Sequence, residues 1–194
     1  MTRSIKISRD TAEVQITGNL DLDGTGTAEI STGLGFLDHM LTALARHSGF
    51  DLRLDVRGDI AVDDHHTVED CAIVIGRALD KLLGDRSGID RFGSAFAPLD
   101  ESLARAVVDC SGRGWPEIHL LLEREMIGDV AAENLTHFFR SLALEGRMAL
   151  HIDVLRGDND HHKAEAAFKA TALALRRAVA PNDDRIRSTK EVLG

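Results

Sequence analysis

The chain has 194 residues, of which 43% are apolar and 28% are charged, ordinary values for a folded globular protein. Apolar residues are too frequent for a disordered chain, and no run reaches the roughly 20 residues that a transmembrane helix needs. The net charge of −9 argues against nucleic acid and membrane surfaces as partners, because both select basic patches. The net charge does not exclude an anionic metabolite as a ligand, since local arginines determine what a pocket binds.

Two cysteines, Cys71 and Cys110, are too few for a disulfide framework and lack the spacing of metal ligands. We expect both to be buried, reduced thiols. The first ten residues contain no hydrophobic core of a signal peptide, so we expect a cytoplasmic protein.

Hydrophobic periodicity in the first half predicts two short strands, a helix, a strand with one buried face, and a second helix. In chain order these elements span residues 4–8, 13–20, 34–47, 51–57 and 67–83. The second half predicts strands over 104–109 and 117–122, and Leu150, Ile152 and Val154 alternate as in a third strand. A last helix carries an apolar stripe from Ala164 to Ala178 and ends before Pro181.

The chain contains an internal repeat. Residues 36–45 align with residues 134–143 at an offset of 98, and each segment carries one histidine in a helical pattern. Residues 64–69 and 160–165 both read Asp-His-His-x-x-Glu, at an offset of 96. Because these offsets are about half the chain length, we infer a duplicated half-domain.

The repeat predicts an α+β fold with internal pseudo-twofold symmetry, in which each half is a small β-sheet backed by two helices. We expect the first half-domain to span residues 1–90 and the second to span residues 91–194, packed as one compact unit.

The doubled motif has the spacing of a metal site. His65 and Glu69 are four residues apart and share a helix face, as do His161 and Glu165. An imidazole and a carboxylate on one face can bind a divalent metal, and this ligand mixture suits Mn, Fe, Co, Ni or Zn. His65 and His66 diverge by about 100° around a helix, so we expect them to face different metals.

Six histidines and two glutamates form the predicted ligand set: His39, His65, His66, Glu69, His137, His161, His162 and Glu165. One division that respects the repeat places His65, Glu69, His137 and His162 on one metal and His161, Glu165, His39 and His66 on the other. Four ligands on an octahedral ion leave two positions for chemistry. The alternative is that Asp64 and Asp160 are helix N-caps followed by surface imidazoles.

Several residues are candidates for holding an anionic substrate, although each alone is also typical of a solvated surface: Arg91, Arg113, Lys169, Ser188, Thr189 and Lys190. His47 follows His39 by two helical turns and is a candidate substrate contact. We expect His119 and His151 to have no role in a site.

Motifs along nearly the whole chain, from about Arg9 to Leu193, resemble the imidazoleglycerol-phosphate dehydratase family. The most specific ones lie at residues 22–26, 32–40, 63–70, 91–93, 98–101, 111–113, 137–139 and 159–165. Departures are few. Residues 145–149 are less apolar than is usual for the family, Arg187 stands where proline is common, and Glu191 stands where glycine is common.

The resemblance implies dehydration of imidazole glycerol phosphate to imidazole acetol phosphate in histidine biosynthesis, with two Mn²⁺ per active site bound by the eight ligands above. It implies a fold of two similar halves, like domain 2 of ribosomal protein S5, and trimers that assemble into a 24-mer with active sites between subunits. The length leaves no room for the phosphatase domain fused to some bacterial members, so we expect a monofunctional enzyme.

The resemblance also implies residue roles. Glu13 falls at the position of the proton-abstracting carboxylate, and Glu69 and Glu165 act beside it at the metals. The residues implied to contact the substrate or its phosphate are Glu13, His39, His47, His65, Arg91, Arg113, His161, Lys169, Ser188, Thr189 and Lys190. The first alternative is a dinuclear metal-dependent hydrolase. The second is an oligomer in which the metal only links the subunits and has no catalytic role.

Overall fold

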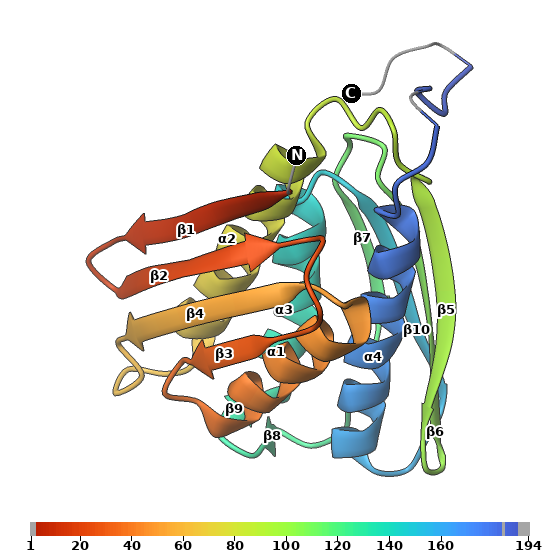
Figure 1. Cartoon of the computed structure of the whole chain (residues 1–194). Coiled ribbons are helices and arrows are strands. Elements are labelled where there is room, and N and C mark those ends of the chain that lie inside the picture. Colours follow the sequence, from red (N-terminus) through yellow and green to blue (C-terminus); the bar gives the residue numbers. More distant parts are fainter. Residues whose placement is uncertain (1–2, 184, 190–194) are drawn as a thin grey trace.

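Alternating apolar residues form two four-stranded sheets, and each sheet is covered on its inner face by two amphipathic helices (Figure 1). The computed structural model describes residues 3–183 and 185–189. The result is four layers, with the helices enclosed between the sheets.

The first half contains four strands and two helices. In chain order they are β1 (Ser4–Asp10), β2 (Val14–Asp21), β3 (Ala28–Ser31), α1 (Gly35–Ser48), β4 (Asp51–Gly58) and α2 (His65–Leu83). The strand order in the sheet is β1-β2-β4-β3, in which β3 runs parallel to β4 and the other neighbours are antiparallel.

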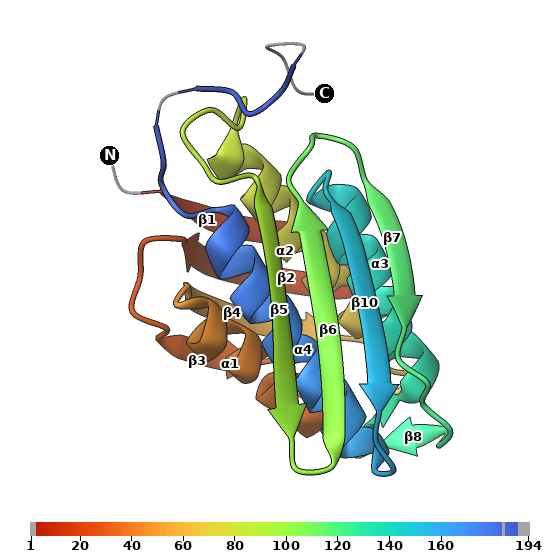
Figure 2. The ribbon, with the colours of Figure 1, turned by 90° about the vertical axis from the view of Figure 1, so that its right-hand side faces the viewer.

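The second half repeats this arrangement with one added hairpin. Its elements are β5 (Phe92–Leu99), β6 (Ser102–Asp109), β7 (Trp115–His119), β8 (Met126–Ile127), β9 (Val130–Ala131), α3 (Ala132–Glu145), β10 (Ala149–Arg156) and α4 (Asp160–Ala178). The strand order is β5-β6-β10-β7, again with one parallel pair, β7 and β10. Figure 2 shows this sheet face-on, with α4 behind it. The predicted α+β class and duplicated architecture are confirmed, and the boundary between residues 90 and 91 stays a prediction.

The core lies between the two sheets. α1 and α2 contact the first sheet, α3 and α4 contact the second, and the layers meet where α1 packs on α4 and α2 packs on α3. Phe138, Phe139 and Phe168 are fully buried there, with ring centroids 4.5–5.6 Å apart. Gly93 lets α4 lie directly on β5, because a Cβ there would come within 1.9 Å of the Ala174 carbonyl oxygen.

The sequence predicts the helices better than the strands. The expected helices 34–47 and 67–83 match α1 and α2 closely. The expected strand 117–122 ends early as β7, because Leu121 has a left-handed backbone (φ 54°) that no strand tolerates. The structure contains two strands that the sequence analysis did not predict, the short β3 and the whole of β5. The inward side chains of β5 are Gly93, Ala95 and Ala97, which give no strong hydrophobic alternation.

Other expectations concern single residues. Cys71 and Cys110 are buried and unpaired as predicted, and burial raises the pKa of the Cys110 thiol to about 12. Within the part of the chain described, no helix is long and apolar enough to cross a bilayer.

Candidate metal centre

The first candidate site joins α2 to α3. Glu69 Oε1 lies 2.9 Å from His137 Nε2, and Glu69 Oε2 lies 3.8 Å from His65 Nε2. The His65 and His137 rings stack with centroids 4.9 Å apart. His65 Nδ1 lies 2.9 Å from the buried Asn134 Oδ1, so an Nδ1–H donates to the amide and leaves Nε2 free to bind a metal.

The second site joins α4 to α1 in the same way. Glu165 Oε2 lies 3.1 Å from His39 Nε2 and 3.3 Å from His161 Nε2. Lys169 Nζ lies 2.7 Å from the other carboxylate oxygen, Glu165 Oε1. Burial opposes ionisation of Glu165, but hydrogen bonds from Lys169 and His39 outweigh it and lower the pKa of this carboxyl group.

Each cluster offers two imidazole nitrogens and one carboxylate oxygen within 4.8 Å of one another. We call them the first triad (His65, Glu69, His137) and the second triad (His39, His161, Glu165). A mixed N/O donor set of this size suits a divalent transition metal better than Ca²⁺ or Mg²⁺. The structure therefore brings together three of the four predicted ligands of each metal.

The fourth predicted ligands, His66 and His162, lie outside the triads. His66 Nδ1 lies 3.1 Å from Asp59 Oδ2, and its Nε2 lies 3.7 Å from Glu13 Oε1. His162 Nδ1 lies 2.8 Å from Glu101 Oε2. The hydrogen bonds to Asp59 and to Glu101 are the main causes that raise the pKa of the two imidazoles.

The helix starts differ from the alternative N-cap interpretation. Asn159, not Asp160, caps α4 by accepting the His161 and His162 backbone N–H groups. Asp64 occupies the N-cap position of α2 without a side-chain cap bond, and its carboxylate instead accepts the Ala131 N–H. In both repeats the two neighbouring imidazoles point in different directions, with ring planes 76° and 86° apart.

Glu13 lies at the turn between β1 and β2, and its side chain is 55% exposed. The matching turn between β5 and β6 carries Glu101, since the two hairpins have the same strand registers. The carboxylate of Glu101 accepts the Asn159 N–H and the hydrogen bond with His162, which holds its pKa well below the usual range. Glu101 lies in the family-like motif at residues 98–101, but the sequence analysis gave it no role; the duplicated hairpin identifies it as the counterpart of Glu13 and therefore as a further candidate site residue.

Arg91 lies at the opposite end of the second sheet from Glu101. It donates two hydrogen bonds to Asp109, at 2.7 and 3.0 Å, and another to the Arg187 carbonyl oxygen. The eight residues of β5 separate Arg91 from the turn that carries Glu101 by about 26 Å. The structure therefore does not bring Arg91 to the second triad of its own chain.

The other predicted substrate residues are dispersed. Arg113 is exposed beside Gly112, whose positive φ of 80° suits a tight turn. His47 is half-buried on α1, and burial is the main cause that lowers its pKa, with the nearby charge of Lys169 adding to it. Ser188 is half-buried and Thr189 is exposed, whereas Lys190 lies outside the described residues. His119 and His151 are both exposed.

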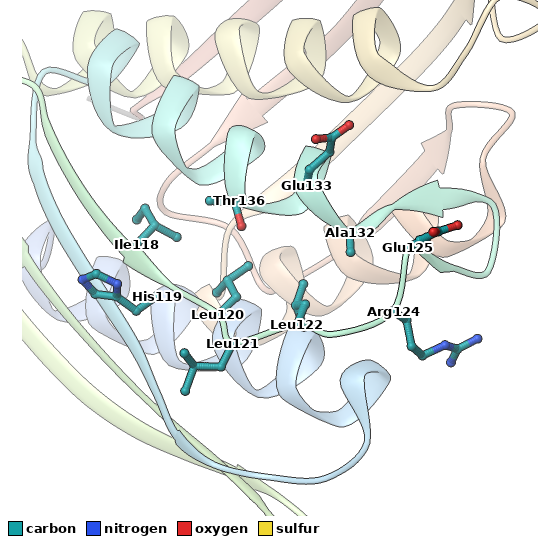
Figure 3. Close-up of a pocket in the computed structure, with 10 residues that line it drawn as sticks. All are labelled: Ile118, His119, Leu120, Leu121, Leu122, Arg124, Glu125, Ala132, Glu133 and Thr136. Atoms are coloured by element: carbon teal, nitrogen blue, oxygen red, sulfur yellow. The ribbon is translucent and has the colours of Figure 1, made fainter.

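A surface cavity of about 600 Å³ lies between β7, residues 120–125 and the start of α3 (Figure 3). Leucines supply much of its wall, and its lining residues are Ile118, His119, Leu120, Leu121, Leu122, Arg124, Glu125, Ala132, Glu133 and Thr136. Neither triad contributes to it, so this cavity is separate from the candidate metal centre.

Comparison with known proteins points to one family. The sequence profile described as imidazoleglycerol-phosphate dehydratase matches residues 32–175. The enzyme of that name from Acidiphilium cryptum is 50% identical over 196 residues, an alignment that covers all of both chains. The one from Phytophthora nicotianae is 57% identical over 192 residues, and the alignment covers 98% of this chain but only 42% of that longer protein.

Two solved structures of imidazoleglycerol-phosphate dehydratases share the fold. The Staphylococcus aureus structure has a TM-score of 0.83 at 38% identity and covers 92% of this chain and 100% of its own. The Pyrococcus furiosus structure has a TM-score of 0.82 at 34% identity and covers 97% of this chain and 100% of its own.

Proposed function

This chain belongs to the imidazoleglycerol-phosphate dehydratase family, and from that premise we propose how its residues carry out the reaction. The enzyme is a hydro-lyase of histidine biosynthesis that removes water from imidazole glycerol phosphate. The observation that carries the proposed chemistry is the pair of equivalent His/His/Glu triads. Membership in this family also disfavours the dinuclear hydrolase that the doubled motif alone left open.

We propose manganese as the metal, with two Mn²⁺ per active site. Each triad has the N/O donors that suit this ion, and Asn134 favours the imidazole tautomer of His65 that can ligate. Bound manganese would supply positive charge beside a deprotonated imidazole ring and beside the departing hydroxyl.

Glu13 is the proposed base. The hydrogen that the reaction removes is bound to carbon and is not next to a carbonyl, so a carboxylate alone faces a high barrier. The exposed side chain of Glu13 can reach a substrate held near His66, 3.7 Å from its carboxylate. The C–H electron pair then becomes the double bond of an enol, the hydroxyl leaves with the C–O pair, and the enol tautomerises to the ketone product.

We propose that Arg91, Arg113 and Lys169 hold the substrate phosphate, together with Ser188, Thr189 and Lys190. Lys169 already contacts Glu165 of the second triad. Arg91 is about 26 Å from the turn beside α4, farther than a three-carbon phosphate ester with one imidazole ring can span. His66 and His162 likewise lie outside the triads.

The proposed active site is therefore composite, with residues from more than one copy of the chain. A homo-oligomer of trimers that assemble into a 24-mer would supply them. We place the enzyme in the cytoplasm, which two unpaired, buried cysteines favour.

Turnover by metal-stripped protein tests the proposal. Imidazole glycerol phosphate is offered with a chelator, with Mn²⁺ and with Mg²⁺, and circular dichroism confirms folding in each sample. We expect imidazole acetol phosphate only with Mn²⁺. Equal turnover in the presence of the chelator would contradict the metal assignment.

A further inference from the structure

The second half carries an insertion between its third strand and its first helix. Ala28 of β3 pairs with Leu52 of β4, and Pro116 of β7 pairs with Leu150 of β10. Since β4 and β10 begin 98 residues apart, Ala28 and Pro116 are equivalent, at an offset of 88. The helices that follow, α1 and α3, align at an offset of 98, so the second half has ten additional residues here. We call residues 120–129, which include β8 and the turn of the β8–β9 hairpin, the inserted segment.

The two helices of the first triad are joined directly at their starts. Asp64 immediately precedes α2, Ala131 immediately precedes α3, and Asp64 Oδ2 accepts the Ala131 N–H at 2.8 Å. One hydrogen bond therefore fixes the start of the helix that carries His65 and Glu69 relative to the start of the helix that carries His137.

The two helices of the second triad are joined through the inserted segment instead. Asp160 is the counterpart of Asp64 in the repeat. Its Oδ2 accepts the Glu123 and Arg124 N–H groups at 2.8 and 2.7 Å. Lys163 is buried beside it and donates to a carbonyl oxygen of the same segment at 3.0 Å. The start of α4, the helix that carries two residues of the second triad, is thus bonded to the first part of the inserted segment.

The far end of the inserted segment lies at the start of α1, the other helix of the second triad (Figure 1). Asp129 accepts the first two N–H groups of this helix, that of Gly35 at 2.5 Å and that of Phe36 at 2.9 Å. These groups have no partner within the helix, and Leu34 at the N-cap position has no polar side chain to bind them. His39 follows Gly35 by about one helical turn, so the position of the α1 start sets that of His39.

Phe36 extends this contact to the imidazoles of the second triad. Its buried ring lies edge-on to those of His39 and His161, with centroids 6.4 and 5.2 Å away. The two imidazole side chains are 47% and 42% exposed, so their own packing holds them only loosely. Gly128 packs on Phe36 so closely that a Cβ there would lie 3.0 Å from the Phe36 Cβ. Ile127, 1% exposed, anchors the inserted segment in the core, which gives it a fixed position beside these rings.

We propose that the inserted segment is a positioning element for the second triad, in which Asp129 orients His39 and His161 through the start of α1. Asp64 has the corresponding role for the first triad at the start of α3. The ligands of a metal need partners that fix their orientation, and here the partners act through the helix starts. The proposal rests on the proposed function in one respect, the binding of a divalent metal by each triad.

Titration of metal-stripped protein with Mn²⁺, followed by electron paramagnetic resonance, tests the proposal at each triad separately. Glu69→Gln leaves the second triad intact and Glu165→Gln leaves the first, so each serves as a parent with one site. In the Glu69→Gln parent, Asp129→Ala should weaken Mn²⁺ binding at least about tenfold, as the loss of an outer partner of a metal site does. In the Glu165→Gln parent it should change binding less than about twofold. Asp64→Ala should show the reverse pattern.

Two further variants separate the position of Asp129 from its charge. Glu125→Ala removes an exposed carboxylate from the same segment and should leave both affinities unchanged. Asp129→Asn keeps one acceptor oxygen and should lose less affinity than Asp129→Ala. Thermal unfolding followed by circular dichroism checks the fold of each variant.

Hydrogen exchange of the metal-free protein gives a readout that needs no metal. Asp129→Ala removes the acceptor of the first two N–H groups of α1, so exchange in residues 34–37 should be at least about threefold faster than in the wild type. Exchange in residues 63–67, at the start of α2, should stay unchanged. Unchanged exchange in residues 34–37 would overturn the proposal.

The outcomes separate this proposal from the proposed function. Asp129→Ala that binds Mn²⁺ like its parent, or loses affinity equally in both parents, would overturn the positioning role while Mn²⁺-dependent turnover of the wild type still supported the function. A loss confined to the second triad, with no turnover by the Mn²⁺-loaded wild type, would support the positioning role and contradict the function. Two parents that bind no Mn²⁺ would contradict both.

Discussion

The two halves of the molecule keep the same metal donors and differ in the groups that hold them. The first triad has Glu69 with a side chain 32% exposed, and the position one helical turn further on is Ile73. The second has Glu165, 13% exposed, and the equivalent position is Lys169, which contacts it. The proposed metal coordination accounts for donors that are the same in both repeats, whereas the neighbouring residues differ.

The helix starts show the same divergence. Lys163 is buried on α4, where its Nζ lies 2.9 Å from Asp160 Oδ1 and 3.0 Å from the Leu121 carbonyl oxygen. The equivalent residue on α2 is Thr67, whose buried hydroxyl has no hydrogen-bond partner within the described part of the chain. The first turn of α4 thus carries a buried ion pair at a position where α2 has an unpaired hydroxyl.

The largest loss of activity is expected from substitution of the histidines that are equivalent in the two halves. His66→Ala and His162→Ala each remove the predicted fourth ligand of one metal, so both should lower bound Mn²⁺ and reduce kcat by at least about 100-fold, above the range for outer-shell partners. Both should also disrupt the large assembly. Elemental analysis and sedimentation measure this, with His151→Ala as the control for metal content. Full metal content with an unchanged sedimentation profile would contradict the assignment.

The next prediction uses the divergence at the helix starts. Lys163→Met leaves the buried Asp160 carboxylate without its ion-pair partner and with only the Glu123 and Arg124 backbone N–H groups as donors, so the free energy of unfolding should fall by about 3–5 kcal/mol. Thr67→Val removes an unpaired buried hydroxyl and should change it by less than about 1 kcal/mol. Urea denaturation of the two variants measures the difference. Equal losses would show that the two helix starts are held alike.

A smaller effect is expected from Glu101→Gln. The amide no longer favours the Nδ1–H tautomer of His162 as a carboxylate does, so Mn²⁺ affinity should fall about 10- to 100-fold while the fold is kept. Excess Mn²⁺ should restore most of kcat, which a merely structural role would not allow. Titration with Mn²⁺ under turnover separates these outcomes, and Glu117→Gln on the same sheet is the control.

The smallest effect concerns Asp51, whose counterpart in the second half is Ala149. Asp51 Oδ1 accepts the Thr27 and Thr25 N–H groups, and these bonds lower its pKa. A carboxyl group with a lowered folded pKa stabilises the protein above its unfolded pKa, near 3.9, and this stability is lost as the pH falls. Asp51→Asn should therefore cost about 1 kcal/mol or less at pH 7, and this cost should shrink as the pH falls below about 3.9 and through the lowered folded pKa. Denaturation measured from pH 7 downward tests this, and a constant difference would contradict it.

The sequence predicted what repeats strongly. The four helices and both Glu/His pairs follow from apolar periodicity and from the doubled Asp-His-His-x-x-Glu motif. The strand β5 was not predicted, because its inner side chains are small and two of its outer ones, Phe92 and Phe96, are aromatic. Glu101 and Asn134 were missed as well, since hydrogen bonds across 61 and 69 residues of sequence leave no local pattern.

The most direct test of the equivalent triads is the Mn²⁺ stoichiometry of the metal-stripped protein, followed by electron paramagnetic resonance and by turnover in the same samples. Because each chain carries two triads, we predict two Mn²⁺ per chain in the wild type. Glu69→Gln and Glu165→Gln should each bind one, and neither should turn over substrate. One ion per wild-type chain, or two ions in either variant, would contradict the account.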